Sequence, residues 1–233
     1  MADVPLVSSM SSMFGESEPY GFLLNVVTVL MIYGPAYLAN TGAMLFGKWI
    51  PDKFGLVNHK IDGGRNYSDG YRILGDGKSW EGLFGGAVFS GLLMILAHVI
   101  WRGRNNSDAR PFIDPLFDAN SSDWYWIGGE YGAAFILGFT LGFACMLGDM
   151  TGSFFKRRRG LKREGDESSE APLLDTLPFA LFIFAAAALL FSNEIIMDDG
   201  LKAPIVAILV LTPVIHRSFN ILGYKLGLKS VPY

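Results

Sequence analysis

Charged residues in one segment of this 233-residue chain alternate between acids and bases in a way that suits phosphate chemistry. The segment holds Asp62-Gly-Gly-Arg65, Asp69-Gly-Tyr-Arg72 and Gly75-Asp76-Gly77-Lys78, so an aspartate followed by glycine recurs every seven residues. Carboxylates bind a hard cation such as Mg²⁺, basic side chains bind phosphate, and glycine lets the backbone approach a ligand closely. A plainer interpretation is a set of Asp-Gly turns, because both residues tolerate a left-handed backbone. The interleaved basic residues favour a phosphate site.

A second charged segment begins at the end of an apolar block. On a continued helix, positions i, i+4, i+7 and i+8 would share one face, and they hold Asp149, Ser153, Lys156 and Arg157. An acid at the membrane boundary is costly unless it lies against a partner, a cavity or an ion. The adjoining Arg158 and Arg159 are interpreted instead as a topology signal that also binds anionic lipid headgroups. Asp175 adds an acid at the head of the next apolar block.

Long apolar blocks must position these two segments. Hydrophobic residues make up 51% of the chain, and its mean hydropathy is +0.33. A spanning helix needs about 20 mostly apolar residues, because the hydrocarbon layer is about 30 Å thick. Pro35 interrupts the first block, which is expected to be tilted, kinked or broken. The sequence predicts an all-α, polytopic membrane protein with about five spans, at roughly 21–47, 83–101, 131–150, 174–193 and 203–222.

Lysine and arginine are unevenly distributed among the connecting segments. The segment before the first block has neither, and residues 194–202 carry only Lys202. Basic residues mark cytoplasmic loops, so we expect an external N-terminus and a cytoplasmic C-terminus, as an odd number of spans requires. The whole chain, 1–233, is then one transmembrane domain. Its cytoplasmic loops lie at about 48–82 and 151–173, and an external loop lies at about 102–130.

Several classes of function and site find no support. A net charge of −3 is too small to argue for a nucleic-acid partner. The single cysteine, Cys145, excludes an intramolecular disulfide and a metal site built from cysteines. His98 lies in an apolar helix and is interpreted as structural, and no Ser/His/Asp grouping supports a covalent hydrolase. Small residues spaced by four indicate close helix packing, at Gly138, Gly142, Gly148 and Gly152.

Together these motifs resemble the archaeal CDP-archaeol synthases, which are relatives of the phosphatidate cytidylyltransferases. The resemblance runs through most of the chain: Tyr37-Leu-Ala-Asn40, residues 69–82, Leu147-Gly-Asp149 through Lys162, Pro172-Leu-Leu-Asp175, and a tail from Leu211 to Tyr233. The signature of the wider family runs Ser-x-x-Lys-Arg and ends in two acids separated by two residues. It is matched here by Ser153, Lys156, Arg157 and Asp175, whereas Pro178 stands at the position of the second acid.

The resemblance implies Mg²⁺-dependent transfer of CMP from CTP to digeranylgeranylglyceryl phosphate, an unsaturated archaetidic acid, which gives CDP-archaeol and pyrophosphate. CTP, an isoprenoid ether lipid phosphate and the bilayer are the implied partners, and a homodimer is left open. The active site would face the cytoplasm from a multi-pass protein of the cell membrane.

Roles follow for the residues of the two segments. The metal is assigned to Asp149 and Asp175, with Asp76 and Asp69 as candidate further ligands. The expected catalytic groups are Asp149, Asp175, Lys78 and Lys156. Substrate binding is expected of Asp69, Arg72, Asp76, Ser153, Arg157 and Asn40.

Two alternatives compete with this interpretation. A CDP-alcohol phosphatidyltransferase also has an Asp-Gly and arginine motif, but Asp69-Gly-Tyr-Arg72 lacks its alanine, and Lys78 intrudes. A non-enzymatic channel or transporter would place polar residues near the middle of the membrane. Here the second and fourth apolar blocks are almost purely apolar, and the polar residues gather at the expected cytoplasmic face.

Overall fold

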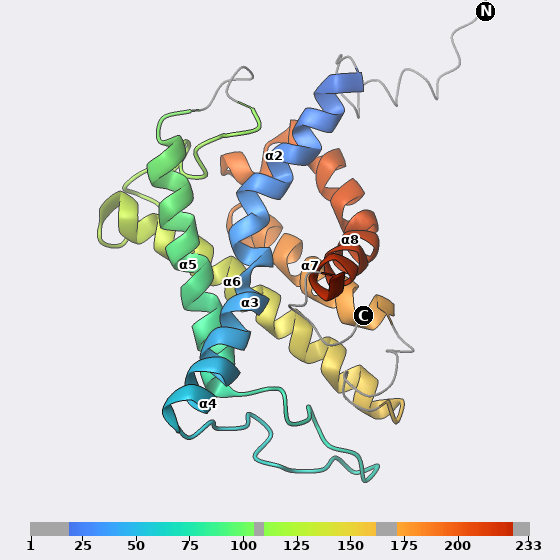
Figure 1. Ribbon diagram of the computed structural model, residues 1–233. Coiled ribbons are helices and arrows are strands. Elements are labelled where there is room, and N and C mark those ends of the chain that lie inside the picture. Colours follow the sequence, from blue (N-terminus) through green and yellow to red (C-terminus); the bar gives the residue numbers. More distant parts are fainter. Residues whose placement is uncertain (1–18, 105–109, 162–171, 226–233) are drawn as a thin grey trace, which may run out of the picture.

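The protein is an all-helical bundle in a computed structural model that describes residues 19–104, 110–161 and 172–225 (Figure 1). Within these ranges, β-type pairing is limited to two isolated bridges. The helices are α2 (Pro19–Tyr37), α3 (Ala39–Met44), the π-helix η1 (Leu45–Trp49), α4 (Ile50–Phe54), α5 (Trp80–Trp101), α6 (Gly129–Arg158), α7 (Pro172–Leu190), the 3₁₀-helix η3 (Ile195–Met197) and α8 (Asp199–Lys225).

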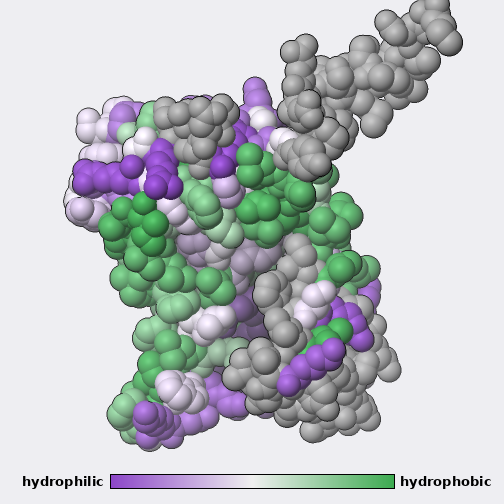
Figure 2. Space-filling view, turned by 45° about the horizontal axis from the view of Figure 1, so that its top comes forward, coloured by the Kyte–Doolittle hydropathy of each residue, from purple (hydrophilic) through white to green (hydrophobic). Residues whose placement is uncertain are grey.

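Four helical runs in the described part of the chain are long and apolar enough to cross a membrane: Gly21–Phe54, Trp80–Trp101, Gly129–Arg158 and Leu173–Leu190. They confirm a multi-pass, all-α membrane protein. Figure 2 shows hydrophobic side chains gathered in a band between more polar ends. Helix α8 covers the fifth expected stretch, 203–222. The count of five and the orientation stay predictions, and residues 1–18 and 226–233 lie outside the described residues.

The first helical run is interrupted, as expected for this block, but at Leu38 and not at Pro35. Helix α2 ends at Tyr37 and α3 begins at Ala39, whereas Pro35, which removes a backbone donor to the preceding turn, lies inside α2. The run then continues farther than expected, through η1 and α4, until Gly55 ends it with a left-handed φ of 64°. The first connecting loop therefore covers 55–79, where 48–82 was expected.

Helix α6 also runs farther than expected. It continues to Arg158, eight residues past the predicted end at 150, and Gly160 follows with a φ of 70°. The basic run therefore lies on the last turn of a helix. The second connecting loop is correspondingly shorter than 151–173, and its residues 162–171 lie outside the described part of the chain.

Helix α6 is the central element, packed on α5 and α7 and in contact with α2 and α3. Its glycines permit this approach. A Cβ on Gly138 would overlap Met94 and come within 2.7 Å of the Ser90 carbonyl oxygen in α5. On the other side, Gly148 lies against the Pro178 carbonyl oxygen in α7. Close packing was the interpretation of the glycine spacing, and these contacts confirm it.

At the end of the bundle opposite loop 55–79, the α5–α6 connection is fastened by a buried carboxylate. Asp114 pairs with Nδ1 of His98 at 2.7 Å and accepts hydrogen bonds from the backbone N–H groups of Gly103 and Leu116, at 2.9 and 3.0 Å. His98 is thus structural, as expected. Trp124 donates to the Leu190 carbonyl at 3.1 Å and satisfies an acceptor at the end of α7.

Replacing Gly138 with alanine is expected to lower the free energy of unfolding by about 1–3 kcal/mol, because a well-packed contact would be overfilled. Alanine is the better helix former, so the matched change Gly34→Ala, where nothing lies within 4 Å, is expected to be neutral or slightly stabilising. Thermal unfolding of the detergent-solubilised variants measures both. Equal midpoints for the two variants would contradict this account of the α5–α6 contact.

Candidate active site

The candidate site lies at one end of the bundle, named here the basic end, which consists of loop 55–79, the last turns of α6 and the start of α7. Within the loop, Ile61 N–H donates to the Lys78 carbonyl at 3.0 Å, and Trp80 N–H donates to that of His59 at 3.0 Å. These bonds pair the two stems of the loop. Ser79 then begins α5 as an N-cap, with its hydroxyl accepting from Gly82 N–H at 3.1 Å.

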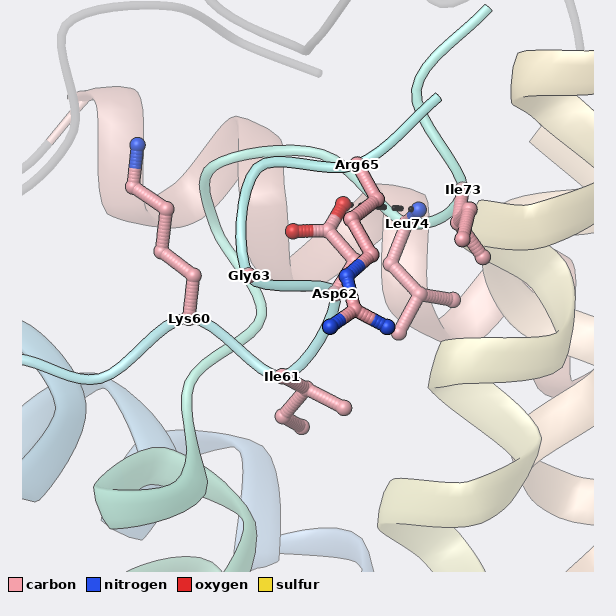
Figure 3. Close-up of a pocket in the computed structure, with 7 residues that line it drawn as sticks. All are labelled: Lys60, Ile61, Asp62, Gly63, Arg65, Ile73 and Leu74. Carbon is pink, nitrogen blue, oxygen red and sulfur yellow. Dashed lines mark hydrogen bonds between the residues drawn. The ribbon is translucent and has the colours of Figure 1, made fainter. Parts of the chain in front are cut away.

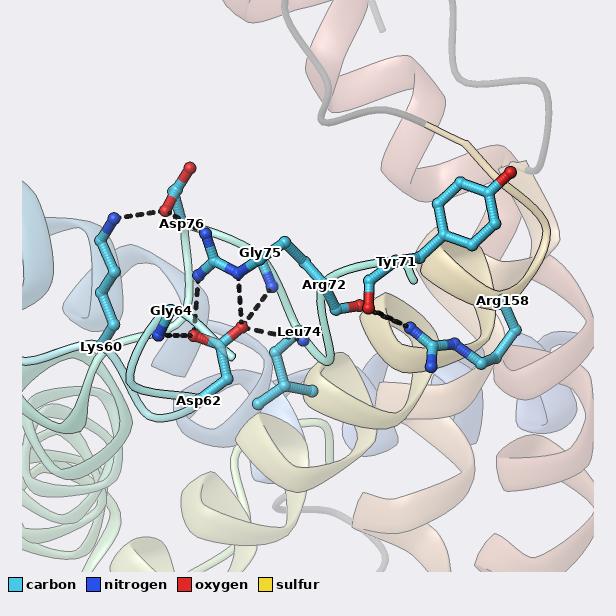
Figure 4. A network of polar contacts seen from close by, with 9 residues as sticks. All are labelled: Lys60, Asp62, Gly64, Tyr71, Arg72, Leu74, Gly75, Asp76 and Arg158. Atoms are coloured by element: carbon cyan, nitrogen blue, oxygen red, sulfur yellow. Dashed lines mark hydrogen bonds and ion pairs between the residues drawn. The ribbon is translucent and has the colours of Figure 1, made fainter. Parts of the chain in front are cut away.

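The loop folds around the Asp62 carboxylate, whose side chain is fully buried (Figure 4). It accepts from Arg72 Nη2 and Nε at 2.7 and 3.2 Å. Three backbone N–H groups also donate to it: Gly64 at 3.0 Å, Leu74 at 3.1 Å and Gly75 at 3.0 Å. Burial opposes ionisation of this group, but hydrogen bonds from Arg72, Gly75, Gly64 and Leu74 outweigh it and hold its pKa well below the usual range.

The turn interpretation of the Asp-Gly pairs is confirmed at two of them, and the phosphate-site interpretation stays a prediction. Gly63 and Gly70 have φ values of 55° and 83°, and Asp69 accepts from Tyr71 N–H at 3.0 Å, so turns do form here. Asp76 does something different. It pairs with Lys60 and, at 2.9 Å, with Arg72. These two contacts, of which the one with Lys60 has the larger effect, hold the pKa of Asp76 below its usual range.

Two acid–lysine pairs link α6 to its neighbours. Lys78, at the end of the loop, contacts Asp149 on α6, and Lys156 on α6 contacts Asp175 on α7. All four side chains are partly or largely buried, so solvent screens these pairs less than surface pairs. Asp149 and Lys156 are seven residues apart, which places them on one face of α6 about 10 Å apart along its axis. The structure therefore brings the four predicted catalytic residues together as two pairs along one face of α6.

Glycine contacts between α6 and α7 set the spacing of this site. A Cβ on Gly152 would overlap the Leu174 carbonyl oxygen, and Gly148 meets Pro178 in the same way. Asp149 follows Gly148 and Asp175 follows Leu174, so the two acids stand beside the helix crossing. Pro178, at the position of the family's second acid, is thus a packing residue here.

The positions of the other predicted site residues say less about their roles. Ser153 is buried on α6, and Arg157 lies beside Gly75, with its Nη1 bonded to the Leu161 carbonyl. Asp69 pairs with Arg158 at 3.2 Å. Asn40 is on α3, and within the described residues it forms no hydrogen bond or ion pair with the four catalytic candidates. In the described part of the chain, no three His, Cys, Asp or Glu side chains form a metal-binding group, so the ligand set stays a prediction.

Three residues of the site were not predicted from the sequence: Asp62, Lys60 and Arg158. Asp62 belongs to a quoted Asp-Gly motif, yet only the folded loop shows that it binds Arg72. Arg158 was interpreted as a topology signal, but it donates to the Arg72 carbonyl at 2.5 Å (Figure 4). Its position four residues after Phe154, on one helix face, is the signal that could have indicated a stacking role.

A hollow of about 340 Å³ opens in the loop beside the ion pairs of Asp62 and Lys60 (Figure 3). Its lining combines aliphatic side chains with charged ones of both signs and one glycine: Lys60, Ile61, Asp62, Gly63, Arg65, Ile73 and Leu74. Its volume falls at the lower end of the range for small-molecule pockets, about 300–1,000 Å³. Ile61, which lines the hollow, is paired through its backbone with Lys78, the loop residue that contacts Asp149.

The apolar helices and the paired acids and bases at one end define an integral membrane protein with a site suited to phosphorylated compounds. Comparison with known proteins makes the class specific. The family model for CarS-like CDP-archaeol synthases matches residues 22–233. The chain belongs to the CDP-archaeol synthase family, and it is therefore an enzyme of the cytidylyltransferase class. The phosphatidyltransferase and transporter alternatives are not retained.

Relatives and a solved structure agree with this assignment. CDP-archaeol synthases of Methanospirillum hungatei and Methanosarcina barkeri are 38% and 35% identical, each over 85% of this chain and 99% of its own length. That of Picrophilus torridus is 34% identical over 91% of this chain and its full length. A solved intramembrane enzyme for archaeal membrane lipids biosynthesis is 25% identical, with a TM-score of 0.54 over 82% of this chain and 92% of its own.

Replacing Asp62 with asparagine is expected to destabilise the folded conformation of loop 55–79. Hydrogen bonds to a charged group contribute about 1.5–3 kcal/mol each, so amide exchange at Gly64, Leu74 and Gly75 is expected to accelerate about tenfold or more. Because the pKa of Asp62 is depressed, this stabilisation is fully present above about pH 4, the ordinary aspartate value, and is lost as the pH falls below it.

Hydrogen–deuterium exchange on the purified protein measures this effect. The matched control is Asp52→Asn, since Asp52 is an exposed acid on α4, and it is expected to leave exchange in the loop unchanged. Unchanged protection in Asp62→Asn would show that the loop does not depend on this carboxylate.

Proposed function

We propose that the protein transfers CMP from CTP to digeranylgeranylglyceryl phosphate at the cytoplasmic face of the cell membrane. An oxygen of the lipid phosphate attacks the α-phosphorus of CTP, and the bond from that phosphorus to the bridging oxygen breaks. Pyrophosphate leaves with the bridging oxygen, and CDP-archaeol is the other product. Family membership supports this reaction.

The observation that carries the proposal is the pair of contacts Lys78–Asp149 and Lys156–Asp175 at the basic end. The lipid phosphate is already ionised near neutral pH, so the reaction needs little help from a general base. Its main obstacle is the approach of one anion to another, and preorganised cations lower that barrier. Lys78 and Lys156 would bind phosphate oxygens, with Arg72 and Arg157 as the neighbouring cations.

Mg²⁺ is the proposed cofactor, with Asp149 and Asp175 as its main protein ligands and Asp76 as a further one. Mg²⁺ sites commonly use one or two carboxylates together with substrate phosphates and water, and the two acids beside the α6–α7 crossing fit that requirement. When bound, the ion would neutralise charge on the triphosphate. Lys78 and Lys156 hold the carboxylates in the structure, and would bind phosphate when a metal takes those oxygens.

The hollow beside Arg65 supports the proposed nucleotide. Ile61 in its lining is paired through its backbone with Lys78, and its aliphatic residues would offer an apolar surface to a nucleoside. CTP arrives from water, whereas the lipid phosphate is already at the membrane surface. A site at the end of the helices, in basic loops that favour the cytoplasmic side, is accessible to both substrates.

Transfer of radiolabel from CTP into an organic-extractable product tests the proposal. Purified protein with Mg²⁺ and digeranylgeranylglyceryl phosphate is expected to form labelled lipid, and Asp149→Asn is expected to reduce the rate about 100-fold or more. The matched control Asp52→Asn is expected to retain the wild-type rate. If folded protein labels no phosphorylated lipid, the CTP assignment is wrong.

Metal and phosphate roles are separated by varying Mg²⁺ and CTP independently. Chelation of Mg²⁺ is expected to abolish transfer. Asp175→Asn is expected to raise the Mg²⁺ concentration for half-maximal rate about 10–100-fold, the usual effect of losing a metal-site group. Lys156→Met is expected to raise KM for CTP without raising the Mg²⁺ requirement, because loss of the lysine leaves Asp175 free for the metal. The same shift in both variants would contradict the assignment of separate roles.

A further inference from the structure

Arg158 is set apart from the rest of the basic run by where its side chain lies. Its side chain is only 16% exposed, whereas Arg159, the next residue, is exposed. A basic residue that serves only as a topology signal or a headgroup contact projects toward lipid and water. Arg158 instead turns toward loop 55–79.

The contacts of Arg158 converge on one short segment of that loop. Its Nη2 donates to the carbonyl oxygens of Arg72 at 2.5 Å and Tyr71 at 3.3 Å (Figure 4). Its Nη1 pairs with the Asp69 carboxylate at 3.2 Å. A single guanidinium thus binds three groups within the four-residue segment 69–72, which ends at Arg72.

Two aromatic rings support this guanidinium. Its carbon lies 4.7 Å from the ring centre of Tyr67 in the loop and 4.9 Å from that of Phe154 on α6. The two rings also contact each other edge to face, with centres 5.8 Å apart. Stacked rings and planar, bidentate donation are properties of arginine that a lysine ammonium does not reproduce.

The loop is consequently attached to α6 at two places. At 3.6 residues per turn, Arg158 lies roughly half a turn around the helix from Asp149. Lys78 holds one arm of the loop against the Asp149 face. Arg158 holds the other arm, with Arg72 at its end, and Arg72 in turn binds Asp62 and Asp76.

We propose that Arg158 is a positioning residue for the nucleotide: it fixes residues 69–72 on α6 so that Arg72 is held in place for the triphosphate. The role rests on the proposed function, since it acts through Arg72 on CTP. It differs from the catalytic roles because Arg158 itself is expected to touch neither substrate.

The test compares Arg158→Lys with Arg159→Lys and Arg159→Gln. Every variant but the last keeps the charge of the basic run, so topology and attraction to anionic lipid are preserved. Arg158→Lys is expected to raise KM for CTP about tenfold or more, with kcat changed little, because the hydrogen bonds that hold the loop are lost. Both Arg159 variants are expected to behave as the wild type. Wild-type kinetics for Arg158→Lys would overturn the proposal.

Hydrogen–deuterium exchange gives a readout that does not depend on activity. Peptides covering residues 67–75 are expected to exchange faster in Arg158→Lys than in the wild type or Arg159→Lys. If the wild type transfers no label from CTP, the proposed function fails, while faster exchange in this region would still establish the attachment of the loop. Unchanged exchange in Arg158→Lys would refute the attachment itself.

Discussion

Close approach of α6 to its two neighbours is the constraint on which the site depends. Where Gly138 meets α5 and where Gly148 and Gly152 meet α7, a larger residue would push the helices apart. Helix packing inside a membrane gains little from burial of apolar surface, because lipid is equally apolar, so close contact between small residues matters more. The Lys156–Asp175 pair forms across the crossing that these glycines allow.

Loop 55–79 solves a different problem, that of ordering a glycine-rich segment that has almost no apolar core. It does so with one buried charge. Asp62 satisfies three backbone donors and one guanidinium, so the cost of removing the carboxylate from water is offset by complete hydrogen bonding. The same carboxylate orients Arg72, which links the folding of the loop to the geometry of the proposed phosphate site.

Much of the fold and part of the site could be predicted from the sequence. Block length and hydropathy predicted the membrane helices, because the thickness of a bilayer limits a spanning helix directly. The spacing of Asp149 and Lys156 predicted their common face, because helical periodicity needs no tertiary information. The role of Pro178 in helix packing could not be read this way, since it depends on which face of α7 meets the glycines of α6.

The contacts within the loop could not be predicted from the sequence, for a related reason. Asp62 and Asp69 occupy equivalent places in the repeated Asp-Gly pattern, yet one is fully buried and the other lies at the edge of the loop. Arg158 and Arg159 are likewise identical in type and adjacent, and only the direction of each side chain from the helix separates them. Such distinctions arise from the folded loop and not from local propensity.

The internal pairing of the lysines has a consequence for turnover. Lys78 and Lys156 already have carboxylate partners within the chain, so in the proposed reaction these contacts would have to open before the lysines bind a triphosphate, and part of the attraction would be offset. Ground-state binding would be weakened accordingly. Once Mg²⁺ has left, the same carboxylates would compete with pyrophosphate for the lysines and favour its departure. An enzyme working in this way would exchange tight binding of its nucleotide for rapid release of a highly charged product.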